Sequence, residues 1–502
     1  MGELLESIAA FLWGLPLIIT IFVTGIYLTI RSKLFQFVHL PHILKQAFTN
    51  MFKKKDTDDN SKGIISSFEA VSTAVGGSVG VANIGGVSTA IAVGGPGAVF
   101  WMWVCALFGM IIKTVEVTLS VHYRNTDENG DPYGGPTYYM EKGLGEEKNF
   151  TYWMIPAILF GFGIFITFFF TLQNYTISEA VSSTFDISMI PISITLMLLT
   201  YYVIYGGIKH VGKVASKLVP FMVLFYILAG IYIIVSNFTQ IDDVLAAIFQ
   251  GAFGGTAAAG GFTGAAVAQA IQMGMARSVY SNEGGWGTSP MVHSTAKVNH
   301  PVKQGVWGAF EVFIDTIVVC SITAFVIIIT GQWSTGLSGA QLTLSAFEVG
   351  VGEIGRIIIT LAVFLFGLTT LTGWYVYYEV LLRHLFRNKS AKLKSRFLTL
   401  YNWIYPIPGT LLVIYAVIQG MPGQTVWYFA DVASAIPTFI NVVVILILSK
   451  KFFALLSDYK ARYMGIGEID PTIDIFYEDR DAGLGSLSQA PQDKAQEDDK
   501  AK

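Results

Sequence analysis

A glycine-rich stretch with one asparagine, VGGSVGVANIGG, lies between Val75 and Gly86 inside an apolar run long enough to cross a bilayer. An unwound turn in hydrocarbon leaves backbone N–H and C=O groups without partners unless it lines a cavity where something else binds them. Amides at the start of a helical segment can bind a carboxylate, and freed carbonyls can bind an ammonium group or Na⁺. This pattern therefore favours a binding site for a zwitterion and a cation.

The alternative is that these glycines only allow helices to pack closely, since small residues recur where membrane helices meet. A second glycine-rich stretch, GAFGGTAAAGGFTGAA, lies within an apolar run near 243–275. Interrupted apolar segments in corresponding places of two halves indicate a binding site of a secondary transporter. Asn83 adds a side-chain donor to the first stretch. The two segments together favour the site over packing alone.

The elements that position these segments are predicted to be membrane helices. The chain has 502 residues, of which 53% are hydrophobic and 13% charged, against about 25% charged in soluble domains. Cys105 and Cys320 lie separately inside apolar runs, which favours packing over a disulfide or a metal site. We predict an all-α polytopic protein with eleven transmembrane helices, near 8–30, 68–93, 97–122, 150–178, 187–207, 213–236, 243–275, 304–331, 353–382, 398–419 and 425–449.

The distribution of basic residues supports this count. If the spans alternate, alternate connecting segments together with the C-terminal tail hold 30 of the 32 Lys and Arg residues. Only Arg356 falls on the other side, and Lys113 lies within a span. By the positive-inside rule, the N-terminus is outside and the C-terminus is cytoplasmic. The net charge of −3 resides in loops and the tail, and we expect no nucleic-acid partner.

Setting the first span aside leaves ten spans, which divide into two sets of five of opposite orientation. We therefore expect an extra N-terminal helix at 1–30 and a cytoplasmic basic segment at 31–67 that forms an amphipathic helix. Two inverted repeats would follow at 68–236 and 243–449. The acidic segment at 450–502 is predicted to be a cytoplasmic, largely disordered tail.

Five sequence blocks resemble the sodium:alanine (alanine or glycine:cation) symporter family. The most specific is GGPGAVFWMWVCALFG, directly after the first glycine-rich stretch. The others are GGPTYYMEKGLG, GGFTGAAVAQAI, YSNEGGWGTSP and TLTGWYVYYE. The resemblance extends from about residue 60 to 450. It departs from the family at Ala82, where glycine is usual, in NEGGWG, where NEAGLG is commoner, and in FFFTLQNYTISEA.

This resemblance implies a leucine-transporter-like, five-plus-five inverted-repeat fold of the APC superfamily. It implies Na⁺-coupled uptake of a small neutral amino acid, alanine or glycine, across the cell membrane by alternating access. The alternative is a sodium- or proton-coupled carrier of another neutral amino acid, such as glutamine or serine. We expect no catalytic residues, no cofactor apart from Na⁺ as coupling ion, and no obligate protein partner.

The resemblance also implies residue roles. It places the amino-acid carboxylate on Asn83 and on main-chain amides near Gly80 and Val81, and the side-chain pocket at Phe170, Gln173, Thr370 and Trp374. For Asn83 and Gln173, a plain interhelical hydrogen bond is the competing interpretation. The sodium site would combine carbonyls and hydroxyls from two helices, at Gly76, Val79, Thr369 and Thr370.

Charged residues within spans are functional candidates by default. Lys113 and Glu116 are three residues apart and are expected to form a structural pair on one helix face. Glu311 and Asp315 fall early in the eighth span and are predicted to lie toward the cytoplasm, and Glu179 at an outer end. We expect no carboxylate at the middle of the central spans, which argues against proton coupling. Neither repeated filter loops of a channel nor a catalytic motif of an enzyme occurs in the spans.

Overall fold

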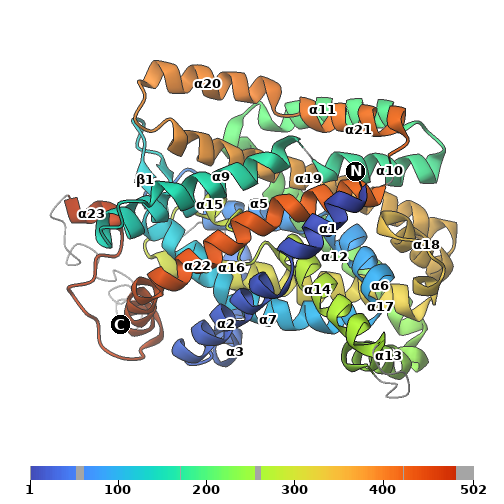
Figure 1. The fold of residues 1–502 in the computed structure, drawn as a ribbon. Coiled ribbons are helices and arrows are strands. Elements are labelled where there is room, and N and C mark those ends of the chain that lie inside the picture. The colour runs from blue at the N-terminus through green and yellow to red at the C-terminus, as the bar shows by residue number, and fades with distance from the viewer. Residues whose placement is uncertain (1, 53–60, 170, 255–261, 422, 482–502) are drawn as a thin grey trace, which may run out of the picture.

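The computed structural model of the chain describes residues 2–52, 61–169, 171–254, 262–421 and 423–481. Within these ranges the protein is almost entirely helical, as Figure 1 shows. The sheet in this part of the chain is one antiparallel hairpin of β1 (Asn125–Thr126) and β2 (Pro132–Tyr133), in which Asn125 lies opposite Tyr133. The all-helical class predicted from the composition is confirmed.

The helices up to residue 236 include the first glycine-rich segment, which divides into α5, a π-helical turn η1 and α6. In chain order they are α1 (Gly2–Leu12), α2 (Leu15–Arg31), α3 (Phe35–Val38), α4 (Leu40–Phe52), α5 (Ser67–Ser78), η1 (Ala82–Gly86), α6 (Val87–Gly94), α7 (Gly97–His122), α8 (Pro136–Tyr139), η2 (Met140–Glu147), α9 (Met154–Phe169), α10 (Leu172–Phe185), α11 (Met189–Ile204) and α12 (Gly207–Ser236).

The helices after residue 236 include the longest one, α22. They are η3 (Phe238–Gln240), α13 (Ile241–Phe253), α14 (Phe262–Asn282), α15 (Pro290–His293), α16 (Pro301–Val312), the π-helical turn η4 (Phe313–Cys320), α17 (Ser321–Ile329), η5 (Gln332–Ser334), α18 (Gly339–Val351), α19 (Glu353–Leu385), α20 (Ala391–Ile404), α21 (Ile407–Gln419), α22 (Gly423–Met464) and α23 (Tyr477–Asp481).

The described helices account for eight or nine of the eleven predicted membrane crossings. Eight helical runs in the described residues are long and apolar enough to cross a bilayer, and a ninth arises if α5 and η1–α6 form one span bent by 41°. α11 is apolar but has only 16 residues, and α13 and α14 are separate helices. The count of eleven is thus not confirmed by these helices, because length and composition alone do not assign the two remaining segments.

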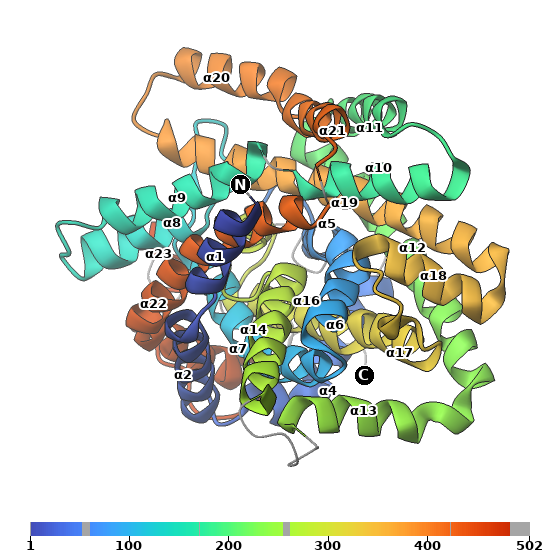
Figure 2. The same ribbon diagram turned by 45° about the vertical axis from the view of Figure 1, so that its right-hand side comes forward.

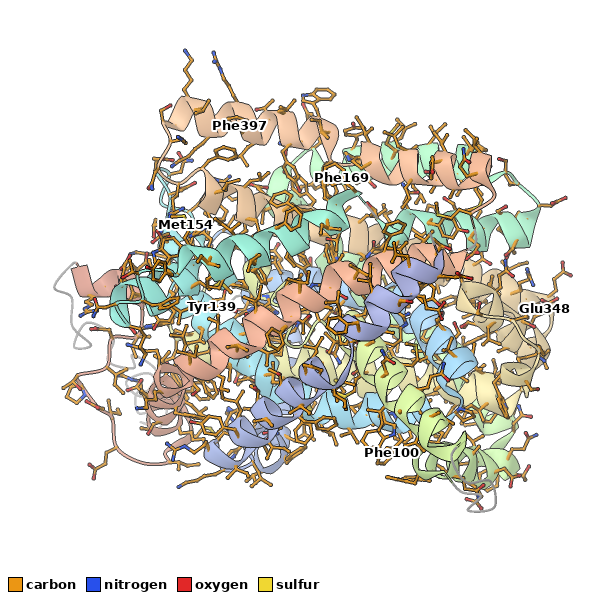
Figure 3. The ribbon with its side chains drawn as sticks, viewed as in Figure 1. Phe100, Tyr139, Met154, Phe169, Glu348 and Phe397 are labelled. Atoms are coloured by element: carbon orange, nitrogen blue, oxygen red, sulfur yellow. The ribbon has the colours of Figure 1, made fainter. Side chains whose placement is uncertain are left out.

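The outer faces of the helices carry large apolar side chains, as expected for contact with lipid. Met154 and Phe169 of α9 are more than half exposed, whereas Tyr139 is fully buried (Figure 3). A soluble protein rarely exposes such large apolar area. The exposed apolar faces of α9 and other helices therefore identify a multi-pass membrane protein.

The segments at the two ends of the chain agree with the prediction in part. The first span is divided into α1 and α2, with Gly14 between them. The basic segment contains α4, in line with the predicted amphipathic helix, and Gln46 of α4 donates to the carbonyl of Lys303 at 3.3 Å. α22 continues to Met464, into the segment predicted to be a tail, and Ile475 and Phe476 beyond it are buried. An acidic composition did not reveal that this part of the tail packs against the other helices.

Two groups of closely packed helices surround the interrupted segment α5–η1–α6. α7 is mostly buried and packs against α14 and α16, while α5 packs between α12 and α19 (Figure 2). Close approach of these helices depends on small residues. A Cβ on Gly373 of α19 would lie 3.1 Å from the Cα of Gly77 in α5. The glycines therefore do serve packing, in addition to any role in binding.

Candidate functional site

The glycine-rich stretch interrupts its helix as predicted. α5 begins with a capping box in which Ser66 and Glu69 bind each other's backbone amides, and it ends at Ser78. Val79 then takes an extended conformation with ψ 93°, and the helix resumes at Ala82. The two parts are bent by 41° relative to each other. The break thus occurs within a fully buried segment.

Threonine hydroxyl groups from the second half of the chain satisfy carbonyls around this break. Thr370 of α19 donates to the Gly76 carbonyl at 3.0 Å. Thr323 of α17 donates to the Asn83 carbonyl, and Thr343 of α18 to the Ile84 carbonyl, each at 2.8 Å. Because buried carbonyls without partners cost free energy, these contacts stabilise the interrupted helix. They also join the two predicted repeats at this point.

Two of the glycines lie so close to opposing side chains that a larger residue would force those side chains to shift. A Cβ on Gly77 would lie 2.5 Å from the Tyr377 hydroxyl, and a Cβ on Gly80 would overlap the Thr370 hydroxyl. Gly80 and Gly77 also line a pocket, described next. Gly77 and Gly80 therefore both allow close helix packing and line the pocket with their backbone.

Two small adjoining pockets lie beside the break and share Gln173, Tyr280 and Trp374. The first is lined by the unwound stretch and by residues of α14 and α19. Its lining residues are Gly77, Ser78, Gly80, Val81, Ala82, Gln173, Tyr280, Glu283, Thr370 and Trp374. The second extends toward α9 and α20, with Thr167, Thr171, Leu371, Tyr378 and Tyr405. Both pockets are lined by a mixture of polar and aromatic side chains.

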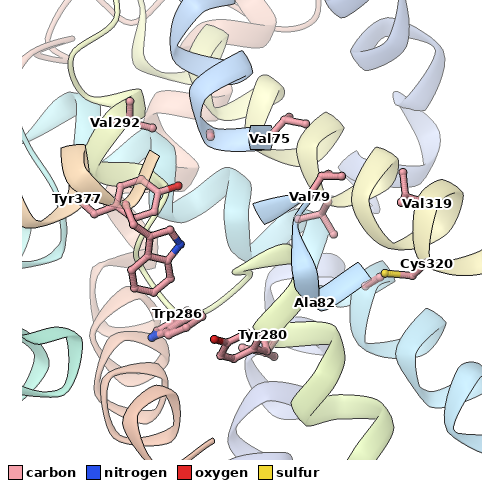
Figure 4. Packing of buried hydrophobic residues seen from close by; sticks show 14 of the residues in the cluster. Val75, Val79, Ala82, Tyr280, Trp286, Val292, Val319, Cys320 and Tyr377 are labelled. Carbon is pink, nitrogen blue, oxygen red and sulfur yellow. The ribbon is translucent and has the colours of Figure 1, made fainter. Parts of the chain in front are cut away.

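The structure brings five of the predicted substrate residues together in these pockets: Gly80, Val81, Gln173, Thr370 and Trp374. The indole nitrogen of Trp374 is buried and has no hydrogen-bond partner among the described residues. Phe170 lies outside the described residues. In Figure 4, Tyr280, Trp286 and Tyr377 approach from one side the segment that contains Val79 and Ala82.

Asn83 takes a different position from the one predicted. It is fully buried and does not line either pocket described here. Its Oδ1 accepts from the Gly80 amide at 2.8 Å, and its Nδ2 donates to Asp315 Oδ1 at 2.6 Å. In this conformation Asn83 therefore stabilises the turn that lines the pocket. This agrees with the competing interpretation of Asn83 as a residue that forms interhelical hydrogen bonds.

Asp315 was not expected beside the break. Its second carboxylate oxygen accepts from Ser281 and Thr316, each at 2.8 Å. The side chain is fully buried, and its partner Asn83 also donates to the thiol of Cys320 at 3.3 Å. The prediction that no carboxylate occurs centrally in the spans is wrong, because Asp315 lies within the buried turn η4 and binds Asn83 beside the helix break.

Three of the predicted sodium ligands are neighbours. Thr370 bonds directly to the Gly76 carbonyl, and a Cβ on Gly76 would lie 3.1 Å from the Cβ of Thr369. The Thr369 hydroxyl donates to the Phe366 carbonyl at 2.8 Å. Val79 follows at the end of α5, where its extended backbone leaves the helix. Carbonyl and hydroxyl oxygens are hard ligands of the kind that Na⁺ requires.

The buried charges pair differently from the sequence prediction. Lys113 forms an ion pair at 3.4 Å with Glu311, not with Glu116, and both partners are fully buried. Glu116 instead accepts hydrogen bonds from the Gly285 amide and from Asn441. The expected i, i+3 pair is wrong because α16 packs directly against α7 and supplies a closer carboxylate.

Tyr280 and Glu283 are pocket residues to which the sequence analysis assigned no role. They belong to the block YSNEGGWGTSP, which carried the family resemblance. Residues 255–261 of the second glycine-rich stretch lie outside the described residues. The pockets are instead lined in part by residues that follow this stretch, at the C-terminal end of α14. An acidic residue next to two glycines, placed directly after an apolar helix, was the available signal.

Comparisons with known proteins agree with this architecture. The model of the sodium:alanine symporter family matches residues 1–469. The sodium/alanine symporter AgcS of Methanococcus maripaludis is 37% identical over 454 residues, which cover 89% of this chain and 94% of that protein. The probable sodium/glutamine symporter GlnT of Bacillus subtilis is 36% identical over 487 residues, with 95% of each chain covered.

Among solved structures, the outward-open, substrate-bound state of a Na⁺-coupled sialic acid symporter is similar to this one. Its TM-score is 0.51 at 12% identity, and the match covers 90% of this chain and 93% of that one. At this identity the likeness shows the fold alone. The described helices thus share the leucine-transporter-like arrangement of that protein.

Proposed function

Because the chain belongs to the sodium:alanine symporter family, we propose that it imports a small neutral amino acid, alanine or glycine in preference, together with Na⁺. It is a sodium-coupled amino acid symporter and not an enzyme. The observation that supports the substrate class is the pocket at the helix break. Gly80 and Val81 line one side of it, and Gln173 and Trp374 line the other.

The pocket suits a small zwitterion for physical reasons. Amides at the start of a helical segment favour a carboxylate, and the break supplies such a start at Ala82. Tyr280 and Trp374 limit the space available to the substrate side chain, and Gln173 offers an amide to a polar one. The Gln173 side chain is the feature that favours glutamine or serine as the second candidate substrate.

Reconstitution tests this proposal. We expect purified protein in liposomes to accumulate labelled alanine when an inward Na⁺ gradient is imposed, and not when K⁺ replaces Na⁺. Unlabelled glycine, serine and glutamine are then added as competitors. Strong competition by glycine supports the small-substrate proposal. Competition by glutamine but not by glycine would contradict it.

We propose that the coupling ion binds at Gly76, Val79, Thr369 and Thr370. Replacing Thr369 or Thr370 by alanine removes a hydroxyl ligand, and we expect the Na⁺ concentration for half-maximal alanine uptake to rise about tenfold, which corresponds to about 1.4 kcal/mol. Thr372→Ala is the matched control, because among the described residues the Thr372 hydroxyl bonds only to carbonyls of its own helix. An unchanged Na⁺ dependence in both Thr369→Ala and Thr370→Ala would refute this site.

We further propose that two inverted repeats, 68–236 and 243–449, rock against each other around this site. The N-terminus would lie outside and the C-terminus in the cytoplasm, as the basic residues indicate. Inward movement of one Na⁺ then gains about 2.3 kcal/mol per 100 mV, in addition to its concentration gradient. This energy accumulates substrate only if ion and substrate favour the same conformational state.

A further inference from the structure

Glu283 is a pocket residue with one unused carboxylate oxygen. It directly follows the end of α14 and lines the pocket together with Gly80, Thr370 and Trp374. The side chain is fully buried. Its Oε2 accepts from the Tyr377 hydroxyl at 3.2 Å, whereas Oε1 has no hydrogen-bond partner among the described residues.

The backbone at Glu283 is strained. Its φ is +56°, a left-handed conformation that glycine adopts freely and that side chains with a Cβ rarely adopt. The amide donates to the Val279 carbonyl at 2.8 Å, which holds the residue at the helix end. Strained backbone of this kind clusters at functional sites, where the surrounding structure maintains it. The conformation orients the Glu283 side chain for the pocket.

Positive charges near this part of the core have other partners. Lys113 pairs with Glu311, and Arg277 binds Asp431 through its two terminal guanidinium nitrogens, Nη1 and Nη2. No ion pair to Glu283 occurs within the described ranges of the chain. An isolated buried carboxylate is unfavourable unless a cation compensates it. The pocket therefore has a place for a positively charged ligand group.

We propose that Glu283 binds the ammonium group of the amino-acid substrate. The substrate carboxylate would face the main chain around Gly80, and the ammonium group would face Glu283 Oε1. The substrate side chain would point toward Gln173 and Trp374, which both pockets share. This assignment rests on the proposed function and makes the α-ammonium group, rather than the side chain, the main requirement for binding.

Binding measurements on detergent-purified protein in Na⁺ test the assignment. Glu283→Gln keeps the shape and removes the charge, and we expect the dissociation constant for alanine to rise about 30-fold or more. Glu116→Gln is the matched control, because Glu116 is equally buried but does not line either pocket. We expect its alanine affinity to stay within about threefold of wild type. Equal losses in both variants, or no loss in Glu283→Gln, would overturn the proposal.

Na⁺ alone separates this proposal from a role of Glu283 in ion binding. We expect Na⁺ without substrate to raise the melting temperature of Glu283→Gln by as much as it raises that of wild type. This result also shows that the variant is folded. A loss of the Na⁺ effect in a variant that still elutes as a monodisperse protein would assign Glu283 to the ion and overturn the proposal.

L-lactate provides a test that needs no substitution, since it replaces the ammonium group of alanine by a hydroxyl. In wild type we expect lactate to bind at least about 30-fold more weakly than alanine. This preference should largely disappear in Glu283→Gln. Equal binding of lactate and alanine to wild type would refute the ammonium site. Failure of wild type to transport any amino acid would instead refute the proposed function.

Discussion

Gly80→Ala is expected to reduce Na⁺-driven alanine uptake by roughly 5- to 150-fold. The added Cβ would overlap the hydroxyl of Thr370, which itself bonds to the Gly76 carbonyl. Overpacking of this kind costs about 1–3 kcal/mol. If the substrate-binding conformation bears this cost, it corresponds to a factor of roughly 5 to 150. The strain falls on the pocket and on the proposed sodium site together. Initial rates of labelled alanine uptake in proteoliposomes measure the effect.

Gly161→Ala is the control for this substitution. Gly161 lies in α9, within an apolar helix, and a Cβ there would meet no atom within 4 Å. We expect alanine uptake by Gly161→Ala to equal that of wild type, since an alanine residue is favourable in a helix. If Gly80→Ala transported as well as Gly161→Ala, the close contact between the break and α19 would not be needed for transport.

Glu311→Gln is expected to have the largest effect on stability. It would leave the fully buried ammonium group of Lys113 without its carboxylate. Removal of one partner from a buried ion pair costs about 3–5 kcal/mol, because the remaining charge is uncompensated. Glu311 also receives hydrogen bonds from Ser289 and His293. We expect a large fall in the melting temperature measured by size-exclusion chromatography of heated, detergent-solubilised protein.

The double variant Lys113→Met with Glu311→Gln tests the cause of this loss. Since no charge is then left buried without a partner, we expect it to recover most of the lost stability. Glu348→Gln is the control, because Glu348 forms its ion pair with Arg356 near the surface. Exposed pairs contribute about 1 kcal/mol or less. A double variant no more stable than Glu311→Gln would show that the ion pair is not the reason for the loss.

Local sequence predicted the features of the site that depend on local physics. An interruption between Val75 and Gly86 followed from glycines in an apolar run, and the helix does break there, at Val79. The composition predicted exposed apolar helices, and the family resemblance placed Gln173, Thr370 and Trp374 at the pocket. Each of these inferences needed only neighbouring residues or a motif.

Features that depend on distant partners were not predicted. Asn83 meets Asp315, which is 232 positions away and lies in the π-helical turn η4. Lys113 selects Glu311 across a helix interface rather than Glu116 on its own helix. The role of Glu283 becomes visible only when its positive φ and its unpaired oxygen are known. Periodicity and spacing carry no information on such contacts.

The most direct test of Na⁺-coupled amino acid import follows labelled Na⁺ and labelled alanine in the same proteoliposomes. The account predicts that alanine outside stimulates Na⁺ entry and that Na⁺ outside stimulates alanine entry, because two ligands that favour the same state promote each other's binding. Gly80→Ala should reduce both fluxes together. Alanine entry that is unaccompanied by Na⁺ entry and that continues at the same rate with K⁺ in place of Na⁺ would contradict the account.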